Sequence, residues 1–170
     1  MHLTTHDELI QDYTALMEGV TAAPALLANT AAWLMEVMPQ LNWAGFYLVS
    51  GEDEKLLLLG HFVGRSACVD IAFGKGVCGT AAERGEAIIV PDVQEFPGHI
   101  ACDARSQSEM VLPFMVQSAE DLTQKHLFGV LDLDAPVKNR FTEDDLALCT
   151  RVLEHLAECL GPQTRGVLRY

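Results

Sequence analysis

Positive charge is scarce in this chain of 170 residues, which carries 11 Lys and Arg against 24 Asp and Glu, a formal net charge of −13 at pH 7. So acidic a protein repels phosphate groups, which argues against nucleic acid and against an anionic membrane as partners. Long apolar runs are missing too. The longest uncharged stretch, residues 19–35, is interrupted by Pro24, Asn29 and Thr30, so we expect no membrane span.

The first residues of the sequence lack both a basic segment and the apolar segment that would follow it in a secretory signal. We therefore expect a cytoplasmic protein, in which structural disulfides are disfavoured. The five cysteines are an odd number, and their spacings are not the paired C-x-x-C kind of structural zinc sites. These absences favour catalytic or redox roles for the cysteines.

The composition that remains, 49% hydrophobic and 21% charged residues, is that of an ordinary globular protein. The sequence contains no repeat, no low-complexity tract and no linker, which predicts a single domain over residues 1–170. We expect N-terminal helices within 1–41, a pocket-bearing sheet region over 42–135 and a C-terminal helix over 142–160.

The periodicity of apolar residues predicts two N-terminal helices, over 5–20 and 24–38, and the C-terminal helix. Six β-rich runs, interrupted by a short helix at 77–84, lie between them. These runs cover 42–49, 55–62, 69–73, 87–90, 109–116 and 127–134. Consecutive strands joined by hairpins favour an α+β fold, in which a mostly antiparallel sheet carries the terminal helices on one face.

Three cysteines lie in one segment beside small or turn-forming residues: Cys68, Cys78 and Cys102. A core cysteine usually has apolar neighbours, whereas a reactive one lies where N–H groups or cations stabilise its thiolate. Cys78, after a glycine turn, and Cys102, in a loop with polar neighbours, resemble the reactive kind. This segment therefore predicts a pocket for thiol chemistry. We expect Cys149 and Cys159, among apolar residues of the last helix, to pack in the core.

Carboxylates form a second candidate group. Asp132 and Asp134 are two residues apart on one predicted strand, so they share a face, while Leu131 and Leu133 point to the other. Glu109 begins the preceding strand and can lie across from them. Clustered carboxylates suit the ammonium group of an amino acid, and crowding raises their pKa, so one of them can hold a catalytic proton. A solvated acidic face is the alternative.

Six short motifs stand between residue 42 and about residue 160. They are NWAGFY (42–47), GVCGTA (76–81), GHIACD (98–103), SEMVLP (108–113), GVLDLD (129–134) and RFTEDD (140–145). Together they resemble GAF domains, and more closely the stand-alone GAF-domain enzymes that reduce free methionine-(R)-sulfoxide. The three cysteines together with GHIACD are the specific part of this resemblance, because the GVLDLD strand is common across GAF domains.

The resemblance implies a GAF-like fold and thiol-dependent reduction of free L-methionine (R)-S-oxide to L-methionine, without a cofactor and with thioredoxin as the reductant. It implies that Cys102 attacks and becomes a sulfenic acid, that Cys68 resolves it as a disulfide, and that Cys78 lines the site. The residues by themselves leave open whether Cys68 or Cys78 supplies the second thiol.

The resemblance also implies that Glu109, Asp132 and Asp134 bind the substrate and handle the proton. Trp43 and Tyr47 share one face of the first strand and either wall the S-methyl group of the substrate or are ordinary core aromatics. The link over 117–126 looks longer than is usual in these enzymes, which leaves the rim of the site and the entry of substrate open. The apolar stripes of the terminal helices suit core packing or a homodimer face.

Two other functions fit part of the pattern. The first is a non-catalytic GAF module that senses a small ligand, although such modules usually sit beside an output domain. The second is a metal site formed by Cys68, Cys78, His99 and Cys102, whose ligand types suit zinc but whose spacings do not. The cysteine set favours the enzyme over both, with no bound metal.

Overall fold

The computed structural model describes residues 5–100 and 102–163, and its elements follow one another as the sequence predicts. The helices are α1 (His6–Met17), α2 (Ala23–Val37), α3 (Gly76–Arg84) and α4 (Glu143–Leu160). The strands are β1 (Trp43–Val49), β2 (Leu56–Val63), β3 (Asp70–Ala72), β4 (Ile88–Val90), β5 (Ser108–Gln117) and β6 (Lys125–Ala135). The segment after β4, predicted as a loop, begins with a single 3-10 turn, η1 (Val93–Glu95).

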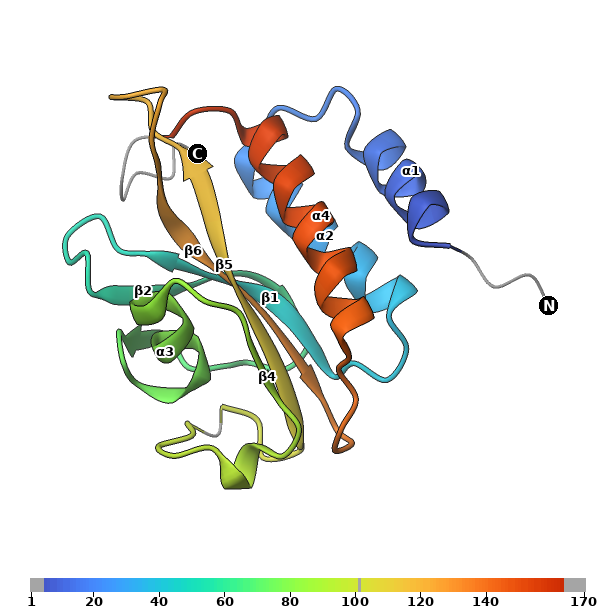
Figure 1. Ribbon diagram of the computed structural model, residues 1–170, viewed down its shortest axis with the longest axis vertical. Coiled ribbons are helices and arrows are strands. Elements are labelled where there is room, and N and C mark those ends of the chain that lie inside the picture. Colours follow the sequence, from blue (N-terminus) through green and yellow to red (C-terminus); the bar gives the residue numbers. More distant parts are fainter. Residues whose placement is uncertain (1–4, 101, 164–170) are drawn as a thin grey trace.

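The strands form one sheet in the order β3-β2-β1-β6-β5-β4, with every neighbouring pair antiparallel. Helices α2 and α4 cover one face of this sheet, and α3 lies against the other (Figure 1). The predicted α+β architecture is confirmed. Helix α1 packs outside α4 and α2 as an additional layer and is not seated on the sheet itself. No helix within the described residues is both long and apolar enough to cross a membrane.

Local signals in the sequence define the ends of the helices. Thr5 and Thr142 each form a capping box, with Glu8 and Asp145 respectively, which satisfies backbone N–H groups that a helix start leaves free. Helix α3 ends at Gly85, whose φ of 65° lies in the left-handed region that favours glycine. These ends place α3 directly after β3, with its first turn directed into the pocket region.

Alternation along the strands separates two buried clusters. Leu131 and Leu133 face α2 and α4 in the larger cluster, which also contains the fully buried Cys149. Val130 faces α3 in the smaller one. Cys159 is half-buried at the margin of the larger cluster, so both cysteines of α4 pack as predicted. Burying each leucine stabilises the fold by about 1.5–3 kcal/mol. The alternation of the strand turns the residues between and beside these leucines toward α3.

The long link between β5 and β6 lies at the far end of the sheet from the loop that carries Cys102 (Figure 1). Strands β5 and β6 span 10 and 11 residues, and at a rise of about 3.4 Å per residue they separate the two ends by roughly 30 Å. The link therefore contributes no residue to the wall of the cavity beside Cys102. Strand β5 starts beside the pocket and reaches the link only after Gln117.

Candidate active site

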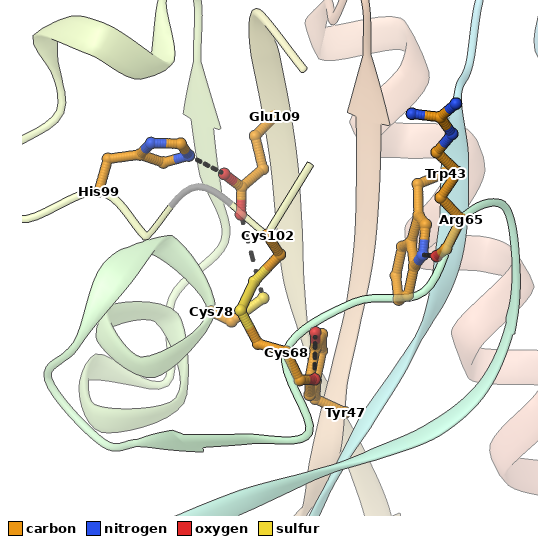
Figure 2. The surroundings of a disulfide bond; sticks show 8 residues. All are labelled: Trp43, Tyr47, Arg65, Cys68, Cys78, His99, Cys102 and Glu109. Carbon is orange, nitrogen blue, oxygen red and sulfur yellow. Dashed lines mark hydrogen bonds and ion pairs between the residues drawn. A yellow bond between two sulfur atoms is a disulfide. The ribbon is translucent and has the colours of Figure 1, made fainter. Parts of the chain in front are cut away.

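A disulfide bond joins Cys68 and Cys102, whose Cα atoms are 5.4 Å apart (Figure 2). Cys68 lies in the link between β2 and β3, and Cys102 lies in the loop between η1 and β5. A Cα separation of about 4.4–6.8 Å is what this bond requires, so the fold brings the two thiols into bonding distance. The structure thus represents the oxidised state of this cysteine pair, and Cys78 stays free and buried beside it.

A small cavity of about 30 Å³ lies beside the disulfide in this oxidised state, which is room for about one or two water molecules. The first turn of α3, residues 99, 100, 102, 103 and 106 of the following loop and the paired strands β5 and β6 contribute its walls. The titratable groups that line it are Cys78, His99, Asp103, Glu109, Asp132 and Asp134, together with Cys102 of the disulfide.

Strand register brings the three central carboxylates together. Glu109 of β5 pairs directly with Asp134 of β6, and Asp132 lies two residues further along β6 on the same face. Glu109 and Asp132 are each 6% exposed. A carboxyl oxygen of Glu109 lies within 4.8 Å of one of Asp132, and two carboxyl groups this close favour a proton on one of them. The predicted convergence of these side chains in a pocket is therefore present, and the solvated alternative is not.

Burial is the main cause that raises the pKa of all three carboxyl groups well above their ordinary values. Repulsion from a neighbouring carboxylate adds to the pKa shift in each case: Asp134 acts on Glu109, Glu109 on Asp132, and Asp132 on Asp134. In addition, Asp132 Oδ1 is buried and accepts no hydrogen bond from the described residues. The cavity therefore combines an available proton with an oxygen that lacks a donor, which suits a cationic ligand.

Cys78 lies in the first turn of α3 and points toward the carboxylates. Its Sγ lies 4.0 Å from Glu109 Oε1 (Figure 2). Burial, followed by the negative charges of Asp132 and Glu109, raises the pKa of the Cys78 thiol well above its ordinary value. Because the thiolate is the reactive form, Cys78 is a poor nucleophile in this environment.

His99 is a site residue that the sequence suggested only as a metal ligand. Its Nε2 lies 3.5 Å from Glu109 Oε2 (Figure 2). Burial lowers the pKa of His99, so its neutral ring faces the carboxyl group of Glu109. Sequence reasoning also missed Ser106, which lines the cavity together with Asp134 and accepts a 3.1 Å hydrogen bond from Asn42 Nδ2. The signal for Asn42 is its position directly before β1, the strand that pairs with the Asp134 end of β6.

Trp43 and Tyr47 share one face of β1, as predicted, and their rings stack with centroids 5.9 Å apart. Neither ring lines the cavity in this oxidised structure. Instead, Tyr47 Oη donates a 3.0 Å hydrogen bond to the carbonyl of Cys68, and Trp43 Nε1 donates one of 3.0 Å to the carbonyl of Arg65 (Figure 2). The two rings therefore anchor the link that carries Cys68.

Gly45 makes the position of the Trp43 ring possible. A Cβ atom at Gly45 would lie 2.6 Å from the Trp43 ring and 2.4 Å from Phe62 Cβ, so only glycine leaves room for both side chains. The Trp43 ring in turn stacks on Phe62 with centroids 5.3 Å apart. Strand β1 thus supports the Cys68 link because the Trp43 ring and Phe62 both approach Gly45 closely, and a larger residue at position 45 would prevent this.

Metal binding was the second alternative for the cysteines. The proposed set of Cys68, Cys78, His99 and Cys102 is incompatible with this state, because a disulfide sulfur offers no thiolate. The structure instead places one ligand atom each from Cys78, Glu109 and Asp132 within 4.8 Å of one another. These donor types suit a borderline cation such as Zn²⁺, but the same three atoms also complete the polar wall of the cavity.

The fold, the disulfide and the acidic cavity can be compared with known proteins. Residues 23–160 match the family model of the GAF domain. Over 138 residues the chain is 48% identical to the free methionine-R-sulfoxide reductase of Escherichia coli, covering 81% of this chain and 78% of that protein. Over 132 residues it is 41% identical to the enzyme of the same name from Saccharomyces cerevisiae, covering 75% and 70%.

Among solved structures, the chain resembles the free methionine-R-sulfoxide reductase of Neisseria meningitidis in complex with its substrate. The TM-score is 0.81 at 34% sequence identity, and the match covers 94% of each chain. The chain therefore belongs to the GAF domain family, in the group that contains the free methionine-R-sulfoxide reductases.

Proposed function

We propose that this chain, working as one GAF-like domain, is an oxidoreductase that reduces free L-methionine (R)-S-oxide to L-methionine with Cys102 as its nucleophile. The observation that carries the proposal is the Cys68–Cys102 disulfide at the edge of a cavity with three buried carboxyl groups. Relatives named for this activity, one of them solved with its substrate, support the assignment.

The reaction divides into two thiol steps. The Cys102 thiolate attacks the sulfoxide sulfur while a proton passes to the sulfoxide oxygen. The resulting hydroxyl then moves to Cys102 Sγ as the bond between the two sulfur atoms breaks with its electron pair on the substrate sulfur, so methionine leaves and Cys102 is left as a sulfenic acid. The Cys68 thiol then attacks Cys102 Sγ, which releases water and forms the disulfide. Cys68 takes the resolving role because it is the partner of Cys102 in this structure, whereas Cys78 is held as a thiol by its acidic surroundings.

The carboxyl groups have two tasks in this scheme. Asp132 Oδ1, which accepts no hydrogen bond from the described residues, accepts one from the substrate ammonium. Glu109 and Asp134, with their raised pKa values, keep a proton in the cavity near neutral pH and can deliver it to the departing oxygen. Trp43 and Tyr47 hold the Cys68 link, and they reach the S-methyl group only if this link moves when the disulfide opens.

Substrate choice tests the proposal. A peptide-bound methionine sulfoxide presents a neutral amide nitrogen, which cannot neutralise the carboxylates. With dithiothreitol as reductant, we expect turnover of the free amino acid, of its R epimer alone, and none of an N-acetylated, amidated substrate. Comparable rates on the blocked substrate, or equal use of both epimers, would contradict the proposal. Binding of the free sulfoxide without any turnover would instead indicate a sensor module.

The physiological setting completes the proposal. Thioredoxin is the reductant, and the cytoplasm, where thiols such as Cys78 and Cys149 stay reduced, is the compartment. A homodimer through the terminal helices is supported by the groove between α1 and α4, whose apolar residues include Ile10, Met17 and Val20. Light scattering on a size-exclusion column tests the dimer, and replacement of the half-exposed Leu16 of α1 by Asp should dissociate it.

A further inference from the structure

Both cysteines of the disulfide are partly buried, but they lie in different parts of the site. Cys102 is part of the wall of the cavity, which is far too small to admit a protein. Cys68 lies in a surface link, with Arg65 and Ser66 exposed before it and Val69 after it. The Val69 side chain is 69% exposed, the highest value for any large hydrophobic residue within the described ranges. An incoming protein therefore meets Cys68 from the outer surface.

We infer that the disulfide is reopened from this side: a protein dithiol of the thioredoxin type docks on Val69 and the free edge of β3, and its thiolate attacks Cys68 Sγ. The inference rests on the proposed function, because it concerns the recycling step of that reaction. It adds where the reductant binds and which sulfur it attacks.

Strand β3 offers a second feature for docking. It is the last strand of the sheet and, within the described residues, pairs with β2 alone. An edge strand presents backbone N–H and C=O groups that another chain can pair with. Because Val69 directly precedes β3, an apolar contact and a backbone edge lie next to the reactive bond. A protein partner can use both features, whereas a small dithiol uses neither.

The link that carries Cys68 is also held in place before any partner arrives. Tyr47 Oη binds the carbonyl of Cys68 and Trp43 Nε1 binds the carbonyl of Arg65, each at 3.0 Å. A surface that is already ordered costs less conformational entropy on binding than one that must be ordered by the partner. The two aromatic residues of β1 are thus positioning residues for the docking surface as well.

Attack at Cys68 also returns the site to its starting state. The reductant thiolate forms a bond to Cys68 Sγ, and the bond to Cys102 breaks with its electron pair on Cys102 Sγ. Cys102 is thereby released into the cavity as the thiolate that the next cycle needs. The second reductant thiol then attacks the reductant sulfur of the mixed disulfide, Cys68 takes up a proton, and the reductant departs as a disulfide after giving two electrons.

The docking surface can be tested on the oxidised protein without any sulfoxide. The variant Val69→Asp places a charge on the surface, and Leu122→Asp, at a side chain that is 61% exposed in the distant β5–β6 link, is the matched control. We expect Val69→Asp to slow disulfide reduction by thioredoxin about tenfold or more, and to leave reduction by dithiothreitol within about twofold. Leu122→Asp should change neither rate. An unchanged thioredoxin rate in Val69→Asp, or equal losses with both reductants, would overturn the inference.

The site of attack is tested separately by trapping. A thioredoxin whose second cysteine is replaced by Ser should form a stable mixed disulfide with the oxidised wild-type protein, and peptide mapping should place it on Cys68. A bond to Cys102, or reduction by thioredoxin that leaves no trapped complex, overturns the inference. Failure of the proposed function looks different, because the wild type would then turn over no free methionine sulfoxide even with dithiothreitol, whatever these two experiments give.

Discussion

The two faces of strand β6 show how one strand serves both stability and chemistry. Leu131 and Leu133 are fully buried against α2 and α4. Asp132 and Asp134, which alternate with them, face α3 and the cavity beside the disulfide. Apolar packing favours the fold on the first face, whereas burial of like charges on the second works against it. The comparison implies that substitutions on the two faces separate stability from activity.

Stability should respond most strongly on the helix face. Replacing Leu131 with Ala removes a fully buried side chain and should lower the free energy of unfolding by about 2–5 kcal/mol. Urea titration measures this loss, and kcat/KM at 25 °C should stay within about threefold of wild type. The volume-conserving Leu131→Met should cost less than about 1.5 kcal/mol. A large loss of kcat/KM in a folded Leu131→Ala protein would contradict the separation of the two faces.

Activity should respond most strongly on the cavity face. Asp134→Asn keeps the size of the side chain and removes its charge, so kcat/KM for free methionine-(R)-sulfoxide should fall by about one to three powers of ten. Steady-state kinetics measure the loss, and the thermal melt should show no destabilisation. Asp12→Asn, on the exposed face of α1, serves as the control and should behave as wild type. Unchanged kinetics in Asp134→Asn would remove this residue from the site.

A smaller effect should appear in the pH dependence of stability. The raised pKa of Glu109 means that the folded protein holds a proton which the unfolded chain releases near pH 4.3. Above that pH the folded state therefore binds more protons than the unfolded chain. The stability that this proton on Glu109 contributes is lost as the pH rises through the folded-state pKa of Glu109.

Glu109→Gln should accordingly flatten the decline of the unfolding free energy between about pH 4.5 and pH 8. Denaturant titrations at several pH values on the wild type and the variant provide the difference curve, with Glu154→Gln on the exposed side of α4 as the control. Parallel curves for the wild type and Glu109→Gln would show that the cluster does not titrate as described.

Much of this arrangement could be read from the sequence because it depends on local rules. Strand alternation and hairpin pairing are short-range, so the shared face of Asp132 and Asp134 and the approach of Glu109 followed from the spacing. The pairing of Cys68 with Cys102 did not follow in that way. It came from the resemblance to known enzymes, because two loops meet there whose paths no periodicity describes.

Two questions that the sequence left open have physical answers in the structure. Antiparallel pairing places the link over 117–126 at the opposite end of β5 from Glu109. The sequence left open whether Trp43 and Tyr47 face the substrate or the core. Their buried rings lie outside the cavity wall in this state, held by hydrogen bonds to Arg65 and Cys68 in a loop. Side-chain orientation toward a loop is a tertiary property, and a strand pattern gives only the face.

The division of labour between Cys102 and Cys68 is tested most directly by a single turnover of free methionine-(R)-sulfoxide with the Cys68→Ser variant and no reductant. The account predicts about one methionine per active site, followed by a stalled sulfenic acid that a dimedone-type reagent traps on Cys102. Cys102→Ser should release none, because a serine hydroxyl at neutral pH does not replace a thiolate. Cys149→Ser, in the helix-face core, should match the wild type. Methionine released by Cys102→Ser, or a dimedone adduct on Cys78, would contradict the account.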